Sequence, residues 1–308
     1  MTLYETSKIV VAIPCYNEAA TIEKVIRDFR SVLQNAEICV FDNNSTDGSA
    51  DLARSAGADV VRVPQQGKGQ VMQAIFNTVV ADALIVVDGD DTYFAADVPV
   101  LLEPILRGEA DMMVGDRLQL SPDHAMRRLH QWGNRLIVAS INRMFGTSFH
   151  DILSGFRVFS RRFVQEVPLL MSGFETETEM TLQALEEGLI VVEVPIQYQS
   201  RPEGSHSKLN TWRDGYRILL TAIILLRDHH PLRLFGIFSL VCWLIALIAF
   251  GLRLINYTGW ELLPDALLSG LVILFAPLGV VVFGFGLVLN AINTRFRELR
   301  QIMQRNKN

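Results

Sequence analysis

The feature that most constrains this chain is a pair of long uncharged segments near its C-terminus. Residues 234–252 lie between Arg233 and Arg253 without a charged side chain, and residues 266–294 carry none either. A helix needs about 20 predominantly apolar residues to cross the roughly 30 Å hydrocarbon core of a bilayer. The segments therefore predict a transmembrane hairpin within residues 232–308. Two buried helices of a soluble domain are the alternative.

Basic residues lie outside the hairpin rather than in its connecting loop. Arg227 and Arg233 precede the first segment. The connecting loop contains one basic residue, Arg253, and two acidic residues, Glu261 and Asp265. The positive-inside rule then places the N-terminal body and the C-terminus in the cytoplasm. Residues 211–231 mix apolar side chains with arginines and predict an amphipathic helix at the membrane interface. The basic residues after the second segment are Arg295, Arg297, Arg300, Arg305 and Lys307.

The body before residue 210 alternates between strand and helix patterns. Continuous apolar runs predict strands at residues 9–13, 38–41, 59–63 and 84–87, with helices at 20–33 and 70–80 between them. Repeated βα units predict an α/β, Rossmann-like fold with a mostly parallel sheet. A mixed pattern follows, with strands at 112–115, 156–159 and 189–196 and helices at 126–145 and 177–187.

Two residues should mark helix ends in this body. Asn17 precedes the amphipathic stretch 20–33 and is expected to cap it, because asparagine accepts hydrogen bonds from the first free backbone N–H groups. Gly57 follows a short helical pattern and is expected at its C-terminal end, where a left-handed backbone is common.

Polar residues follow three of the expected strands. Ligands of open α/β sheets bind beyond the carboxyl ends of the strands, so residues 14–18, 42–47 and 88–91 should line one cleft. Residues 86–92 read VVDGDDT and place three carboxylates together, which repel one another unless a cation lies among them. Oxygen ligands suit Mg²⁺ or Mn²⁺, which typically joins carboxylates to substrate phosphates. An exposed acidic turn is the alternative interpretation.

Several other classes of site are disfavoured. No GxGxxG follows the first strand, and residues 67–69 (GKG) lack the spacing of a Walker A loop, which disfavours a dehydrogenase or a P-loop phosphotransferase. A net charge of −5 argues against a nucleic-acid partner. The three cysteines form no CxxC or Cys/His cluster, and the six histidines show no metal-binding spacing and are expected at the surface or at interfaces.

Short motifs occur in a fixed order through residues 8–210. They are PCYNE at 14–18, DNNSTDG at 42–48, GKG at 67–69, DGD at 88–90, SGFR at 154–157 and SKL at 207–209. As an ordered set they resemble the GT-A-fold, family 2 glycosyltransferases, in particular the branch of dolichol-phosphate mannose synthases and polyprenyl-phosphate glycosyltransferases. The two C-terminal spans resemble those of bacterial polyprenyl-phosphate glucosyltransferases.

This resemblance implies roles for individual residues. Asp88 and Asp90 would hold Mg²⁺ or Mn²⁺ beside the donor diphosphate and, with Arg117, form the catalytic set. Thr92 stands where the mannose synthases often have a glutamine ligand, and Asp91 is the alternative third ligand. Arg117 and Arg127 would bind the acceptor phosphate, and Asp42 would recognise the nucleobase of the sugar donor. The remaining members of the nucleotide-sugar site would be Pro14, Tyr16, Asn17, Glu18, Lys68, Gly89, Arg201 and Lys208.

The resemblance also implies an activity and a setting. The chain would be an inverting hexosyltransferase that moves a sugar from GDP or UDP to a polyisoprenyl phosphate, undecaprenyl or dolichyl, for cell-envelope glycans or protein glycosylation. A catalytic domain at residues 1–210 would face the cytoplasm on the inner membrane, and a homo-oligomer is compatible with this family. The alternatives are a processive polysaccharide synthase, although residues 131–135 (QWGNR) do not fit its Gln-x-x-Arg-Trp motif, and a non-catalytic nucleotide-sugar scaffold.

Overall fold

The structure is a computed structural model that divides the chain into two compact units, Met1–Ile218 and Leu219–Asn308. It describes residues 3–120, 138–139, 141–143, 145–167, 176–202, 224, 227, 230–257 and 263–305. Arg127, Lys208, most of the expected helix 126–145 and nearly all of the expected interfacial segment 211–231 lie outside these residues. Each unit is considered by itself.

The first unit is built on one seven-stranded sheet, ordered β3-β2-β1-β4-β6-β5-β7. All neighbouring strands pair in parallel except at β6, which is antiparallel to both β4 and β5. Segment 117–156 therefore leaves β5 and returns to β6 at the same edge of the sheet. The strands are β1 Ile9–Cys15, β2 Glu37–Asp42, β3 Asp59–Arg62, β4 Ala83–Val86, β5 Met112–Asp116, β6 Arg157–Ser160 and β7 Val191–Pro195.

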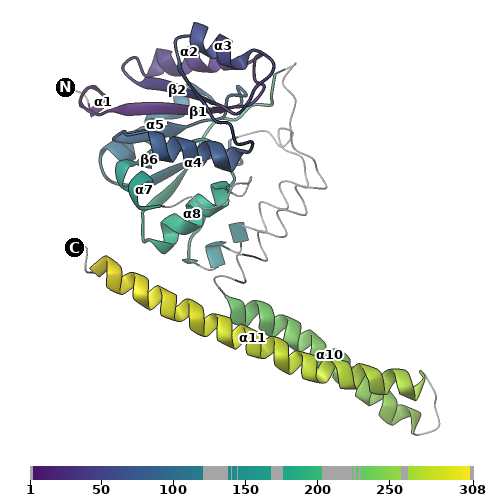
Figure 1. The fold of residues 1–308 in the computed structure, drawn as a ribbon. Coiled ribbons are helices and arrows are strands. Elements are labelled where there is room, and N and C mark those ends of the chain that lie inside the picture. Colours follow the sequence, from purple (N-terminus) through teal and green to yellow (C-terminus); the bar gives the residue numbers. More distant parts are fainter. Residues whose placement is uncertain are drawn as a thin grey trace. The chain divides into compact units, whose positions relative to one another are not determined.

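Helices cover both faces of this sheet (Figure 1). One apolar core lies under α2, α3 and α5, and a second lies under α4, α7 and α8. The central strands β1 and β4 are almost wholly buried, which explains why their sequences are continuously apolar. The helices are α1 Leu3–Thr6, α2 Ile22–Val32, α3 Ser49–Ser55, α4 Lys68–Thr78, α5 Val98–Leu106, α7 Arg161–Glu166 and α8 Thr176–Glu186, and a short 3₁₀ helix, Ala95–Asp97, precedes α5.

The predicted helix ends had different outcomes. Gly57 follows α3 with a φ of 84°, as expected for a helix C-terminus. The capping role of Asn17 was wrong, because α2 begins at Ile22 with Thr21 at its N-cap position. Asn17 instead has a left-handed φ of 53°, and its Oδ1 accepts a 2.8 Å hydrogen bond from the backbone N–H of Thr46. It ties the loop after β1 to the loop after β2.

The second unit is a hairpin of two long helices, α10 Pro231–Asn256 and α11 Asp265–Arg305. Both are long and apolar enough to span a membrane, with candidate spans at Pro231–Asn256 and Asp265–Phe296. Only 17% and 11% of their most apolar windows are buried, which a core helix of a soluble domain would not show. The unit is therefore a candidate membrane hairpin, as the sequence predicts.

Polar and small residues hold the two helices together. Ser239 Oγ donates a 2.8 Å hydrogen bond to the carbonyl of Gly279, and Trp243 Nε1 donates at 3.3 Å to the carbonyl of Ala276. A side chain at Gly279 would overlap the Trp243 ring. Close approach at small residues and hydrogen bonds between helices are characteristic of membrane helix pairs.

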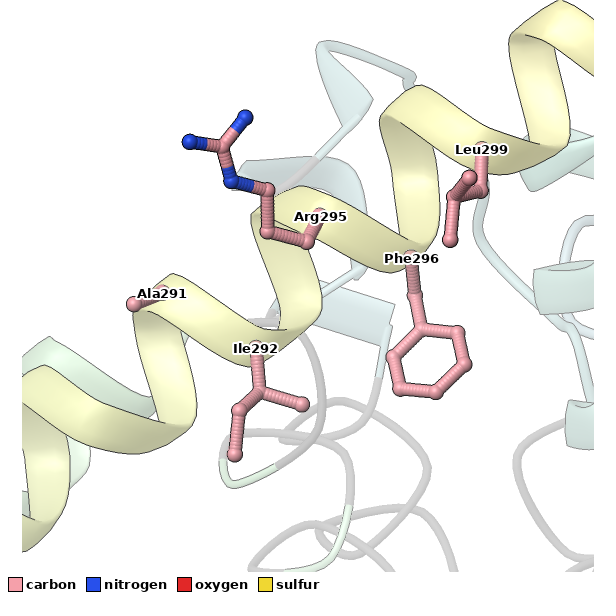
Figure 2. A pocket seen from close by; sticks show the side chains of 5 residues that line it. All are labelled: Ala291, Ile292, Arg295, Phe296 and Leu299. Carbon is pink, nitrogen blue, oxygen red and sulfur yellow. The ribbon is translucent and has the colours of Figure 1, made fainter.

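A hollow lies on α11 near the end of the candidate span. Figure 2 shows Ile292, Phe296 and Leu299 on one side of the helix and the Arg295 guanidinium pointing the other way. Ala291 completes the lining. Among the residues that line this hollow none is a carboxylate, so it offers no oxygen ligand for a metal ion.

Candidate active site

Two loops join at the carboxyl ends of β1 and β2. The backbone N–H of Asn17 donates to Ser45 Oγ at 2.9 Å, and that of Glu18 donates to Ser49 Oγ at 2.8 Å. Asp42, 6% exposed at the end of β2, accepts a 3.3 Å hydrogen bond from the backbone N–H of Ser45. The predicted segments 14–18 and 42–47 therefore do form one edge of a site.

Asn43 connects these loops to the residues before α4. Its side-chain amide donates to the carbonyls of Val63 and Gln65 at 3.0 and 2.6 Å, and its Oδ1 accepts from the backbone N–H of Gly67 at 2.8 Å. Gly67, with a φ of 131°, directly precedes Lys68. The GKG segment is thus fixed to the β2 edge, and Lys68 starts α4 beside the carboxylates that follow β4.

Lys68 is the cation that balances Asp88. Its Nζ lies 2.9 Å from Asp88 Oδ1 and 2.7 Å from Glu177 Oε1 on α8. Burial would lower the pKa of Lys68, but the two carboxylates raise it above its ordinary value. Burial likewise opposes ionisation of Asp88, yet Lys68, Arg201 and Arg117 hold the pKa of that carboxyl below its usual range. Glu177 could not be predicted from the sequence, because its separation from residue 88 gives no local signal.

Asp90 is held by Arg201 and Thr92. Arg201 Nη2 lies 2.7 Å from Asp90 Oδ2, and Nη1 lies 3.6 Å from Glu18 Oε1. Thr92 Oγ1 donates to Asp90 Oδ1 at 2.6 Å. Burial, reinforced by the charge of Asp88, raises the pKa of Asp90. The structure therefore brings Glu18, Asp88, Asp90 and Arg201 together, as the sequence predicts for the donor site.

The remaining predicted donor residues surround these carboxylates. Gly89 lies under the loop after β1: a Cβ there would come within 3.3 Å of both Ile13 Cγ2 and Ile22 Cδ1. Pro14 is the penultimate residue of β1. Tyr16 is 38% exposed, so it is a surface residue rather than part of the core.

Asp91 turns away from its two neighbours in the DGDD segment. Its backbone has a left-handed φ of 59°, and its Oδ1 lies 2.7 Å from Lys24 Nζ on α2. Thr92 Oγ1 is engaged by Asp90. Neither residue is placed as a third metal ligand in the described part of the chain. Asp88 and Asp90 remain as paired oxygen donors.

The two carboxylates fit a divalent cation by their chemistry. Asp90 is buried and Asp88 is partly exposed, and both supply only oxygen. Burial and the charge of Asp88 both raise the pKa of Asp90, and a cation would relieve that repulsion. The adjacent cations Lys68 and Arg201 are suited to a phosphate-bearing ligand. A second group with metal-ligand character, Asp116, His150 and Glu193, lies elsewhere in the described residues.

Arg117, just beyond β5, is clamped by Asp151. Its Nε and Nη2 donate to the two carboxylate oxygens at 2.6 and 2.8 Å, and its guanidinium carbon lies 5.4 Å from the centre of the Tyr198 ring. The side chains of Asp151 and Arg117 are 0% and 11% exposed. Burial would lower the pKa of Arg117, but Asp151 raises it. A guanidinium has five N–H donors, so this bidentate pair leaves others for a ligand.

Gly155 allows the segment before β6 to pass against Asp88. A Cβ at residue 155 would overlap Asp88 Oδ2 and Cγ. We expect Gly155→Ala to displace Asp88, to destabilise the fold by about 1–3 kcal/mol as overpacking typically does, and to lower catalytic turnover. Gly108→Ala is the control: its φ of 71° adds backbone strain of about 1–2 kcal/mol, but no neighbour lies within 4 Å. Equal turnover of the two variants at equal stability would refute this role of Gly155.

Comparisons with known proteins identify the family of this chain. Residues 10–167 match the model of glycosyl transferase family 2. Glycosyltransferase AglJ of Haloferax volcanii is 36% identical over 94% of this chain and 95% of its own length. The dolichyl-phosphate hexose transferase of the same organism is 27% identical over 71% of this chain and 93% of its own. The polyprenol monophosphomannose synthase of Mycolicibacterium smegmatis is 27% identical over 66% of this chain and 82% of its own length.

The fold also has solved counterparts. Glucosyl-3-phosphoglycerate synthase from Mycobacterium tuberculosis, solved with Mn²⁺, uridine diphosphate and phosphoglyceric acid, superposes with a TM-score of 0.60 at 23% identity, covering 73% of this chain and 79% of that one. The expected GT-A fold is thus confirmed. From the match over residues 10–167 and the near full-length similarity to AglJ, the chain belongs to glycosyltransferase family 2.

Proposed function

We propose that this glycosyltransferase moves a hexose-type sugar from a GDP- or UDP-sugar to the phosphate of a polyisoprenyl lipid, undecaprenyl or dolichyl phosphate. The observation that carries the proposal is the combination of a donor-type carboxylate site with a candidate membrane hairpin in one chain. Two of the relatives are named for transfer involving dolichyl phosphate or polyprenol. The product would supply cell-envelope glycans or protein glycosylation.

The chemistry is a single in-line displacement at the anomeric carbon. An oxygen of the lipid phosphate forms the new bond to that carbon as the bond to the donor's β-phosphate oxygen breaks, and the nucleoside diphosphate leaves with the electron pair. A phosphate oxygen is already anionic near neutral pH, so the step needs no strong general base. The protein's task is to position two anions and to stabilise the leaving group.

The residues divide between these tasks. Asp88 and Asp90 would hold Mg²⁺ or Mn²⁺, which when bound neutralises charge on the diphosphate. Lys68 and Arg201 already lie against these carboxylates and would exchange part of that contact for the donor phosphates. Arg117, oriented by Asp151 and Tyr198, would hold the acceptor phosphate together with Arg127. Lys208 would join Arg201 at the donor phosphates.

The domain plan follows from the same proposal. Under this proposal residues 1–210 would be the catalytic domain, 211–231 an interfacial segment and 232–308 the hairpin, whose role would be to keep the enzyme at the membrane that holds the lipid phosphate. The charge distribution around the spans supports a cytoplasmic catalytic domain and C-terminus.

The proposed orientation can be tested by protease access in sealed vesicles. We expect an epitope placed after residue 308 to be removed from the cytoplasmic side only. An epitope inserted between residues 257 and 263 should be protected from that side. Removal of both epitopes from the same side would contradict a two-span hairpin.

The activity can be tested with the purified full-length chain in detergent. Radiolabelled GDP- and UDP-sugars would be offered one at a time with undecaprenyl or dolichyl phosphate, and label entering the organic phase would be measured. We expect one donor to label the lipid in a single, chelator-sensitive transfer. Label found instead in a polymer would favour a polysaccharide synthase, and donor binding without any transfer would favour a scaffold.

Asp42 should act on the donor and leave the acceptor unaffected. Loss of a hydrogen bond to a charged group typically costs about 1.5–3 kcal/mol, or roughly ten- to a hundredfold in binding. Asp42→Ala should raise the KM of the donor by about that factor with little change in the KM of the lipid. Arg127→Ala is the reciprocal variant and should do the reverse. Equal loss of donor affinity in both would place Arg127 in the nucleotide site.

A further inference from the structure

A second cluster of ligand-type side chains lies outside the donor carboxylates. Asp116 ends β5, Glu193 lies on β7 beside it, and His150 comes from the segment that returns toward β6. One ligand atom from each side chain lies within 4.8 Å of the other two. These residues are far apart in the chain, so no sequence spacing reveals them.

The distances inside this cluster suit a small metal ion. His150 Nδ1 is 3.2 Å from Glu193 Oε2 and 3.8 Å from Asp116 Oδ2. In a tetrahedral site with metal–ligand bonds of about 2.0–2.2 Å, neighbouring ligand atoms are about 3.4 Å apart. These two separations lie on either side of that value, and all three ligand atoms lie within 4.8 Å of one another.

The state of Asp116 is the second, independent observation. Its side chain is 0% exposed. Oδ1 accepts a 2.8 Å hydrogen bond from the backbone N–H of Leu118, but the buried Oδ2, which faces His150, has no hydrogen-bond partner. A buried carboxylate oxygen without a hydrogen-bond partner is costly, so this atom, which lies beside two other ligand-type side chains, is suited to a cation.

Metal binding would leave the backbone contacts of Glu193 in place but replace the present hydrogen bonds of the His150 ring nitrogen. Glu193 already accepts 2.6 Å hydrogen bonds from the backbone N–H groups of His150 and Asp151, and a carboxylate has about four lone-pair sites in all. His150 Nδ1 is also 3.3 Å from Gln119 Nε2, and this exposed amide would have to give way. The His150 side chain is 59% exposed, which leaves an entry path and a coordination position for water.

We propose that Asp116, His150 and Glu193 bind a divalent transition-metal ion of the Zn²⁺ class, separate from the ion of the donor site. A nitrogen ligand with two carboxylates favours such an ion over Mg²⁺, which prefers oxygen ligands alone. The ion positions Arg117: it joins Asp116, the residue before Arg117, to His150, the residue before the Asp151 that clamps Arg117. The inference does not depend on which donor or acceptor the enzyme uses.

The test is metal binding to the full-length protein in detergent, stripped with a chelator and then titrated with Co²⁺ in excess Mg²⁺. Co²⁺ in a four-coordinate site absorbs visible light far more strongly than six-coordinate Co²⁺, so its d–d bands distinguish this site from an octahedral oxygen site. We expect one Co²⁺ per chain that Mg²⁺ does not displace, together with a rise in Tm. His150→Gln should weaken the binding of this Co²⁺ by at least about 100-fold, which is more than the loss of an outer-shell partner typically costs.

Three further variants make the outcome decisive. Asp116→Asn keeps the acceptor for Leu118 and should also lose the ion. Asp90→Asn, in the donor site, and His230→Gln, at the start of α10, should retain it. Absence of the Mg²⁺-resistant Co²⁺, or a Co²⁺ signal unchanged in both His150→Gln and Asp116→Asn, would overturn the proposal. A signal lost in Asp90→Asn instead would assign the ion to the donor site.

Discussion

Asp90→Asn should reduce sugar transfer by at least about 10²–10³-fold, the loss that follows removal of one preorganised electrostatic group. Asp90 is one of the two carboxylates of the DGDD segment that we propose as metal ligands of the donor site, and asparagine is a much weaker ligand for Mg²⁺ or Mn²⁺. The fold should survive, because burial and Asp88 already raise the pKa of Asp90, which makes the neutral form acceptable there. Transfer to lipid would be measured with and without chelator, alongside Tm.

The neighbouring residue gives a matched control. Asp91→Asn changes the same side chain one position away, where it pairs with Lys24. This variant should retain metal-dependent transfer and lose only the small contribution of a partly exposed ion pair. A fully active Asp90→Asn, or wild-type transfer indifferent to chelation, would remove the metal role from this segment.

Arg117→Ala should destabilise the protein by about 3–5 kcal/mol, because it leaves a buried charge without its partner. Asp151 has no exposed side-chain surface and receives two side-chain hydrogen bonds from Arg117. Denaturation of the detergent-solubilised protein would measure the change. The surviving folded fraction should also show a raised KM for the lipid acceptor, which loss of stability alone would not cause.

A double variant and the pH dependence test the cause of this loss. Arg117→Ala/Asp151→Asn should recover part of the stability, since residue 151 then carries no charge that needs Arg117 as its partner. Burial opposes ionisation of Asp151, but Arg117 lowers its pKa. The contribution of the pair is therefore complete above the unfolded-state pKa of about 3.9 and is lost as pH falls through the lower folded-state pKa. A stability gap between wild type and Arg117→Ala that stays constant below pH 4 would contradict this account.

The sequence predicted the fold well because burial leaves a strong pattern. The runs that became β1, β2 and β4 are apolar throughout, and the apolar residues of α2 recur at helical spacing, with Ile22, Val25, Ile26 and Phe29 buried. Asn17 was misread because asparagine suits both a helix cap and a left-handed turn, and the choice depends on a loop from β2. The antiparallel direction of β6 likewise has no signature in four residues.

Only part of the candidate site could be predicted from the sequence, because the rest depends on packing between distant elements. Asp88, Asp90 and Glu18 lie at strand ends, where the topology of any parallel sheet collects ligands. Their partners come from elsewhere: Glu177 reaches Lys68 from α8, and Tyr198 lies against Arg117 from beyond β7. Pairings between distant elements are set by tertiary packing, so periodicity and motif spacing carry no information about them.

The reversed direction of β6 has an evolutionary consequence. Because the chain leaves β5 and re-enters β6 at one edge, segment 117–156 is an excursion whose two ends are joined by Arg117 and Asp151. Doubling the length of such an excursion costs only about 0.6 kcal/mol in closure entropy, and it shifts no strand register. This segment can therefore gain residues at little cost while Arg117 and Asp151 keep its two ends together. Insertions there would change the surface beside Arg117 without rebuilding the sheet.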